Sequence, residues 1–338
     1  MLLVFDSQLA SPCSRSDMRT GVFKSRAPER PARMVDRFRT IDKSDLDALE
    51  SALRANYFRA CPGGYLSTEW GRRDLADHLY ARLEADRSEV IPWLDATRCL
   101  HGATVLEIGC GTGSSTVALA EQGARITAID SDKGSLVVAG DRCRAYGLDV
   151  ELIEANATQV GELLSNRHFD FVIFYASLEH MTIAERISAM SSTWSMLVPG
   201  DLWCVVETPN RLWYYDAHTS LLPFYMWLPD ELAFAYSRFS PRQDFRELYR
   251  ESSSEAMLHF QRRGRGVSFH EFEVAMKSAQ ELKVLSSLSE SRAKRGFWRR
   301  LIKRSSDEER YVASLRKLAP EIHEGFFQPF LYLIIEKD

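Results

Sequence analysis

The sequence predicts an α/β fold in which helices connect the strands of a mostly parallel, doubly wound sheet. Three observations predict it: apolar strand segments alternate with helical segments from residue 103 to about 206, a glycine-rich turn follows the first strand, and helix signals punctuate the alternation. Gly123 and Gly147 stand where helices end in a left-handed residue, and "TIAE" at 182–185 is a capping box. The strands are expected at 103–108, 125–129, 149–153, 169–174 and 201–206, and the helices at 114–122, 133–146 and 183–197.

The alternation stops after Glu207 and resumes near residue 267. The stretch 209–266 is dense in aromatic residues and proline, and we expect an insertion that forms a lid or a substrate wall. Beyond it, "SFHEFEVAMKSAQ" predicts a helix, and "LKVLSSL" and "FFQPFLYLIIE" predict two more strands, which brings the sheet to seven. The core therefore comprises 99–208 and 267–338.

Two segments of different composition precede this core. Residues 1–40 are rich in Arg, Ser and Pro without a sustained period, so we expect a flexible arm. Residues 41–98 carry apolar residues at helical spacing, which predicts a helical extension with Ser67 or Thr68 capping its second helix.

Composition narrows the functional classes. A net charge of -4 with 45% hydrophobic and 27% charged residues is typical of a globular protein, whereas a general nucleic-acid binder would be basic, so we expect no nucleic-acid partner. The cysteines form no C-x-x-C pair, which disfavours a zinc cage or a disulfide framework, and we predict no metal site. "MLLVF" is too short for a signal-peptide core and no stretch approaches about 18 apolar residues, so a cytoplasmic protein is expected. The sequence leaves a homo-oligomer open.

The glycine turn identifies the kind of ligand. From Gly109 the sequence reads G-C-G-T-G-S, so Ser114 stands where a dinucleotide fingerprint needs its third glycine, and a nicotinamide enzyme is disfavoured. Glu107, at the mouth of the first strand, would repel a pyrophosphate and attract an ammonium and a sulfonium. Asp130, at the end of the second strand, is placed to accept both hydroxyls of a ribose. These two carboxylates describe an amino acid joined to a nucleoside without phosphates.

The chain resembles the class I S-adenosylmethionine-dependent methyltransferases. "VLEIGCGTGSST", "ITAIDSD" and "ELIEANAT" look like their first three motifs, and "FDFVIFYASLEHM" and "MLVPGDLWCVVETPN" look like the fourth and fifth strands with the intervening turn. The "LEHM" element is most similar to the branch of ubiquinone-biosynthesis and sugar or natural-product O-methyltransferases. One departure is Asp201, where the turn often has a second glycine. The resemblance implies a Rossmann-like sheet with an antiparallel last strand, and S-adenosylmethionine as cofactor.

The resemblance also implies roles for individual residues. The groups assigned to the cofactor are Glu107, Gly109, Gly111 and Gly113 around the methionyl part, Asp130 on the ribose, Ser131 beside the adenosine, Asn156 and the Ala157 amide at the adenine edge, and Tyr175 near the methyl group. Cys110 lies inside the loop, where a small packed side chain is a better explanation than a nucleophile, because transfer from a sulfonium needs none. Tyr65 in the helical extension is a possible cofactor contact.

Catalysis is expected at the end of the fourth strand and in the insertion. His180 is the first candidate base for a hydroxyl acceptor, with His218 as its rival, although either could merely cap or pack a loop. Glu179, Arg211 and Asp216 are candidate acceptor contacts. Glu179, Asp216 and the two histidines could in principle hold a divalent metal, but their spacing is not diagnostic.

The insertion's aromatic residues suggest a wall for a sugar or aromatic face. Trp213, Tyr214 and Trp227 are the substrate-binding candidates, and a lid core of their own is the competing explanation. The basic run 292–304 has the form of a helix that meets anionic lipid, although an ordinary solvated helix explains it better. These features predict methylation of a hydroxyl on a small molecule, glycosidic or phenolic. A protein, RNA or lipid-linked acceptor and a non-catalytic S-adenosylmethionine-binding protein remain alternatives, but no N/D-P-P-Y type motif follows the fourth strand.

Overall fold

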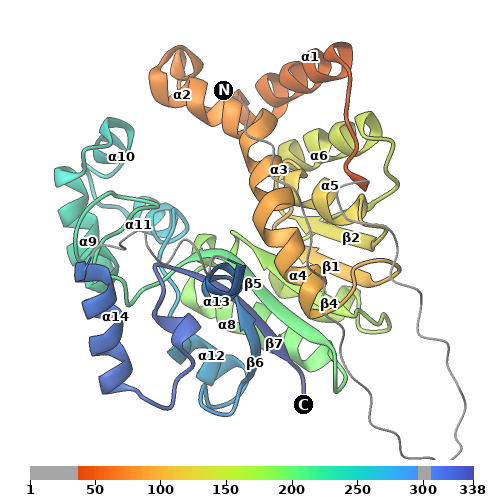
Figure 1. Ribbon diagram of the computed structural model, residues 1–338. Coiled ribbons are helices and arrows are strands. Elements are labelled where there is room, and N and C mark those ends of the chain that lie inside the picture. Colours follow the sequence, from red (N-terminus) through yellow and green to blue (C-terminus); the bar gives the residue numbers. More distant parts are fainter. Residues whose placement is uncertain (1–36, 296–305) are drawn as a thin grey trace, which may run out of the picture. The chain divides into compact units, whose positions relative to one another are not determined.

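A computed structural model of the chain describes residues 37–295 and 306–338 (Figure 1). Its centre is a seven-stranded sheet of order β3-β2-β1-β4-β5-β7-β6. β7 runs antiparallel to both of its neighbours, and all other pairings are parallel, so the predicted fold class is confirmed. The strands are β1 (Thr104–Ile108), β2 (Arg125–Asp130), β3 (Glu151–Glu154), β4 (Phe171–Tyr175), β5 (Leu202–Pro209), β6 (Lys283–Ser287) and β7 (Phe330–Glu336).

The strand order reverses between β1 and β4. The chain moves from β1 outward through β2 to β3 and then returns to place β4 on the other side of β1. The connections on the two sides of this point pass over opposite faces of the sheet. A crevice therefore opens between them at the carboxyl ends of the strands, where ligands bind in open α/β sheets.

Helices cover both faces of the sheet. On one face, side chains of α7 (Val160–Leu163), α8 (Ile183–Met196) and α12 (Phe269–Ala275) share a buried cluster with Leu106 and Ile108 of β1. On the other face, α4 (Ile91–Thr97), α5 (Ser114–Ala120) and α6 (Lys133–Ala145) pack on Val105. The alternation of strand side chains between faces therefore builds two cores from one apolar strand.

Local signals explain where these elements begin and end. Gly123 and Gly147 have φ of 86° and 61°, the left-handed conformation expected after a helix. Thr182 and Glu185 form the capping box of α8 with reciprocal side-chain bonds. The predicted strands and helices of the alternating region agree with the structure to within about three residues at each end.

The helical extension forms a long rod beside the sheet. The extension begins with α1 (Lys43–Ala52). Further along, one continuous helical run consists of α2 (Glu69–Ala76), η5 (Asp77–Ala81), α3 (Arg82–Ala85), η6 (Asp86–Val90) and α4. Thr68 caps α2 by accepting a hydrogen bond from the Gly71 amide. The segments η5 and η6 are π-helical, as are residues Leu53–Tyr57, and such turns shift the face that a helix presents.

The region after β5 has a small core of its own. Its helices are α9 (Asp230–Tyr236), α10 (Gln243–Leu248) and α11 (Ser254–Gln261), and they enclose a cluster of buried aromatic and aliphatic side chains. Later in the chain come α13 (Leu288–Arg295) and α14 (Ser306–Leu318).

Several predicted features fall outside the described residues. These are nearly all of the arm 1–40 and, within the basic run 292–304, residues 296–304. Arg292, at the start of the run, forms an ion pair with Glu89. Across residues 37–295 and 306–338, no helix has the length and hydropathy needed to cross a bilayer.

Candidate active site

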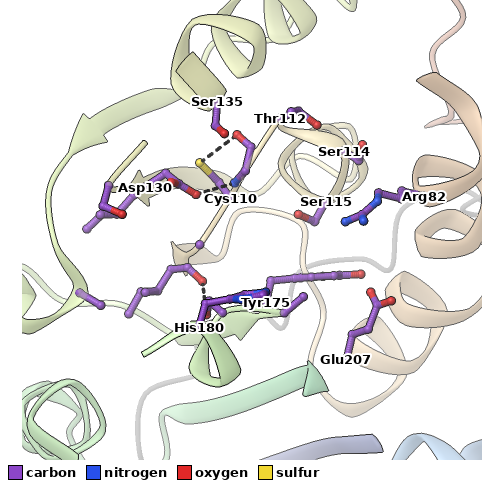
Figure 2. A pocket seen from close by; sticks show the side chains of 18 of the residues that line it. Arg82, Cys110, Thr112, Ser114, Ser115, Asp130, Ser135, Tyr175, His180 and Glu207 are labelled. Atoms are coloured by element: carbon purple, nitrogen blue, oxygen red, sulfur yellow. Dashed lines mark hydrogen bonds between the residues drawn. The ribbon is translucent and has the colours of Figure 1, made fainter. Parts of the chain in front are cut away.

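A cavity of about 710 Å³ lies at the carboxyl ends of the strands, as Figure 2 shows from close by. Its floor comes from the ends of β1, β2 and β4 and from the glycine turn, and its cover comes from η5, α3 and the start of η6. The volume falls in the range of small-molecule and cofactor sites. The cavity therefore lies at the point where the strand order reverses.

Two different structural requirements explain the three glycines of the turn. A Cβ on Gly109 would lie 2.3 Å from the Ser177 Cβ, and a Cβ on Gly113 would lie 2.9 Å from the Ala139 Cα, so both permit close packing within the protein. Gly111 has φ of +51° and lines the cavity, yet a Cβ there would meet no protein atom within 4 Å. Gly111 therefore leaves ligand space open, whereas Gly113 does not line the cavity.

Asp130 has a structural role and also lines the cavity. Its Oδ2 accepts a hydrogen bond from the Gly111 amide at 2.8 Å, and its Oδ1 accepts one from the Asp132 amide at 2.8 Å. Burial raises the pKa of the carboxyl, but Asp130 and Ser131 still line the cavity. Each carboxylate oxygen has a second lone pair, so Asp130 can accept hydrogen bonds from a ligand diol without releasing the loop.

Glu107 does not lie where the sequence predicts. Its side chain is fully buried and does not line the cavity. Its oxygens accept hydrogen bonds from the Ser115 hydroxyl and, at 2.6 Å, from the Thr116 hydroxyl at the start of α5. The prediction of direct attraction to a ligand cation was wrong, because the strand turns this side chain toward α5. Burial raises its pKa to about 7.

The turn after β3 closes another side of the cavity. Asn156 and Ala157 line it, and the Asn156 Oδ1 caps the turn by accepting from the Thr158 amide and hydroxyl, each at 2.9 Å. With that oxygen engaged, Asn156 offers its side-chain NH₂ group to a ligand. Cys110 also lines the cavity, and burial raises its pKa well above the usual thiol value, so it stays a neutral thiol.

Tyr175 meets an acidic residue that sequence reasoning missed. Its hydroxyl donates to the Asp86 carboxylate, and both residues are buried in the cavity wall. Burial raises the pKa of Asp86 to about 8 and that of Tyr175 well above 10. No short motif marks Asp86. Its signal in the sequence is that polar residues recur along one face of the helix "DHLYARLEAD".

The same cover contributes further polar groups. Asp77, His78 and Arg82 line the cavity beside Asp86, and in Figure 2 the Arg82 side chain points into it toward Ser115, with Glu207 on the same side. Glu207 has φ of +58°, and Ala176 at the end of β4 has φ of 43°. Non-glycine residues in the left-handed region mark local strain, and such strain concentrates at ligand sites.

Three other polar side chains meet beside the cavity. Glu179 Oε1 lies 4.0 Å from His180 Nε2 and 3.9 Å from His218 Nε2, and the two imidazole centroids are 5.8 Å apart. Both histidines line the cavity, and Glu179 is fully buried behind them. Burial raises the pKa of Glu179 to about 8 and lowers that of His218 to about 3. The structure thus brings these three sequence-predicted residues together.

Asp216 does not join them. Its carboxylate accepts hydrogen bonds from the amides of His218, Thr219 and Ser220 and from the Ser220 hydroxyl, so it organises its own loop. Arg211 pairs through its backbone amide with the Val267 carbonyl and does not line the cavity.

The predicted aromatic wall is also absent from the cavity lining. Trp213 and Tyr214 pack edge-on against Tyr311 of α14, and Trp227 is half-exposed beside Phe224. None of Trp213, Tyr214 and Trp227 belongs to the buried cluster of α9–α11 either, so the alternative of a lid core of their own does not describe them. Tyr65 is likewise outside the lining, because its hydroxyl donates to Asp74.

Comparisons with known proteins agree with this geometry. Residues 105–200 match the family model described as "Methyltransferase domain". A ubiquinone biosynthesis O-methyltransferase of Pseudomonas entomophila is 33% identical over 110 residues, 32% of this chain and 46% of that protein. A cypemycin N-terminal methyltransferase of Streptomyces is 42% identical over 67 residues, 20% of this chain and 26% of that protein. This chain therefore spans about half the length, or less, of these curated relatives.

A solved structure gives a comparison at the level of the fold. The magnesium protoporphyrin IX methyltransferase of Synechocystis, solved with bound S-adenosylmethionine, is 21% identical, with a TM-score of 0.36 over 51% of this chain and 79% of that one. The family match covers the segment that carries the glycine turn, Asp130 and the first four strands. Residues 105–200 are thus similar to the methyltransferase domain of class I S-adenosylmethionine-dependent methyltransferases, whose cofactor is S-adenosylmethionine.

Proposed function

We propose that this chain transfers a methyl group from S-adenosylmethionine to a hydroxyl of a small, polar molecule. The observation that carries the proposal is one cavity that is lined both by Asp130 and Asn156 and by two imidazoles, those of His180 and His218. The first pair suits a nucleoside, and the second suits a group that must lose a proton.

The residues present fit the donor. Gly111 leaves backbone open to the ligand, the Asp130 carboxylate has lone pairs for ribose hydroxyls, and the Asn156 NH₂ group suits an acceptor nitrogen of adenine. The Arg82 guanidinium, in the cavity wall, suits the methionyl carboxylate. The sulfonium supplies an activated methyl group, so the protein's task is to bind, orient and exclude water.

The acceptor end supports oxygen as the methylated atom. His180 Nδ1 lies 3.1 Å from the Arg262 carbonyl oxygen, an acceptor, so this nitrogen carries the hydrogen and Nε2 is left as a bare base. A neutral imidazole is a suitable proton acceptor near neutral pH. We assign His180 as the base and keep His218 as its rival.

The lining favours a hydroxylated acceptor over a nucleic acid. The cavity is lined by the acidic residues Asp77, Asp86 and Glu207 as well as by Arg82, and such a lining offers few cations to RNA phosphates. The aromatic residues of the insertion lie outside the lining, so a glycoside-like polyol fits better than a large phenolic ring. A lipid-linked acceptor of the same head-group chemistry is the second candidate.

The test is an acceptor screen with methyl-labelled S-adenosylmethionine and mass-spectrometric detection. The panel should hold glycosides, phenols, a peptide mixture and RNA. Label in a hydroxylated small molecule supports the proposal, and label confined to peptide or RNA contradicts it. Tight binding of S-adenosylmethionine without any transfer across such a panel would favour the non-catalytic alternative.

A further inference from the structure

Beside the cavity, lone-pair atoms of Glu179, His180 and His218 converge. Two facts fix the histidine tautomers. His180 Nδ1 faces the Arg262 carbonyl at 3.1 Å, and His218 Nδ1 faces the Thr219 hydroxyl oxygen at 2.9 Å. That hydroxyl donates its own hydrogen to the Gly264 carbonyl at 2.8 Å, so it can only accept from His218. Both imidazoles therefore carry the hydrogen on Nδ1 and present a bare Nε2.

Glu179 adds the third donor atom. Its Oε2 accepts from the Thr208 hydroxyl at 3.3 Å, but its Oε1 is buried and, among the described residues, has no hydrogen-bond partner. This is the same oxygen that lies 4.0 Å from His180 Nε2 and 3.9 Å from His218 Nε2. A buried carboxyl oxygen that has no hydrogen-bond partner and faces two lone pairs is costly unless a positive species, either a proton or a metal ion, lies among them.

We propose that Glu179, His180 and His218 bind one divalent transition-metal ion, with Zn²⁺ as the ion that the donor set suits best. Two imidazoles and one carboxylate with a remaining open position are the ligand set of catalytic zinc sites. Imidazole donors favour zinc and its neighbours over Mg²⁺, which prefers oxygen.

The geometry is close to what such an ion needs. All three donor atoms lie within 4.8 Å of one another. Tetrahedral zinc with bonds of about 2.1 Å separates its ligand atoms by about 3.4 Å, so each donor must move by roughly half an ångström. The Nδ1 bonds to Arg262 and Thr219 supply the outer hydrogen bonds that orient metal-binding histidines.

The site joins the fourth strand to the insertion. Glu179 and His180 follow β4, whereas His218 comes from the chain beyond β5. Since both histidines line the cavity, the open position of the ion would face the acceptor. There the ion would hold the acceptor oxygen and lower the pKa of its hydroxyl, so that the proton would pass to solvent water. With the ion bound, His180 Nε2 would be a ligand, and this route would replace the imidazole base assigned under the proposed function. This role rests on the proposed function, because it needs an oxygen acceptor, whereas binding of the ion does not.

The experiment measures metal directly on the full chain. Protein treated with a chelator and desalted is titrated with Zn²⁺ by calorimetry and, in parallel, with Co²⁺ by visible absorption, which reports the coordination geometry. We expect one equivalent in the wild type and at least a tenfold loss of affinity in Glu179→Gln, His180→Ala and His218→Ala. His168→Ala is the matched control, because His168 is half-exposed beside Asp201 and lies outside the cavity.

Two results would overturn the metal site. One is the absence of a stoichiometric Zn²⁺ or Co²⁺ equivalent in the wild type, and the other is unchanged affinity in the three ligand variants. Binding of S-adenosylhomocysteine to each protein confirms that it is folded. That measurement also separates the two proposals. If the wild type bound the metal ion but not S-adenosylhomocysteine, the proposed function would be contradicted and the metal site would stand.

Discussion

Replacing Asp130 with asparagine removes one charge and leaves the side-chain shape nearly unchanged. In the wild type the two carboxylate oxygens accept from the amides of Gly111 and Asp132, each at 2.8 Å, and both retain lone pairs toward the cavity. Asparagine has a single acceptor oxygen, so it cannot hold both amides and a ribose diol. Hydrogen bonds to a charged acceptor contribute about 1.5 to 3 kcal/mol, which corresponds to about a 10- to 150-fold weaker Kd for the cofactor.

Isothermal titration calorimetry with S-adenosylmethionine and S-adenosylhomocysteine measures this change. Asp132→Asn is the matched control, because Asp132 caps α6 through the Gly134 and Ser135 amides and does not line the cavity. We expect the control to lose stability but keep its affinity. A Kd for Asp130→Asn within twofold of the wild type would refute the assignment, since it would show that Asp130 only shapes the turn.

The remaining predictions concern the loop, the cover and the acceptor end. Gly111→Ala should weaken S-adenosylhomocysteine binding at least tenfold by calorimetry, because its Cβ would enter ligand space, whereas Gly200→Ala, also at positive φ but outside the cavity, should not. Asp86, with its pKa raised from 3.8 to about 8, holds a proton in the folded state that the unfolded chain releases, so its contribution to stability falls as pH rises from about 4 to 8. The melting temperature of Asp86→Asn minus that of the wild type should therefore rise across this window and level off above pH 8, and a flat difference would contradict the raised pKa. His180→Ala should lower kcat by roughly a hundredfold with cofactor affinity nearly unchanged, and a fully active variant beside an inactive His218→Ala would move the base into the insertion.

Periodicity and local signals predicted the fold well. Each strand of the alternating region is a short apolar run. The helices end at glycines or begin at a capping box, so local sequence determines where each element begins and ends. Gly111 and Asp130 were equally predictable, because a turn between a strand and a helix must face the carboxyl edge of a parallel sheet.

The rest of the site depends on contacts between distant segments. Asp86 and Arg82 reach the cavity only because the helical rod crosses the sheet edge, and nothing in their own neighbourhood encodes that crossing. Glu107 was assigned to the ligand from its place at the end of a strand, but a single side chain can turn toward the following helix, as it does here. Trp213 was assigned to a wall because clustered aromatics suit both a ligand and a small core, and composition alone does not separate these uses.

The crystal structure of the chain with S-adenosylhomocysteine tests the central claim most directly. The account predicts the ribose hydroxyls within about 3.2 Å of the Asp130 carboxylate, the adenine against Asn156 and Ala157, and the sulfur directed toward Tyr175 and His180. Density for the ligand at any other place, or an unliganded cavity in crystals soaked at saturating concentration, would contradict it.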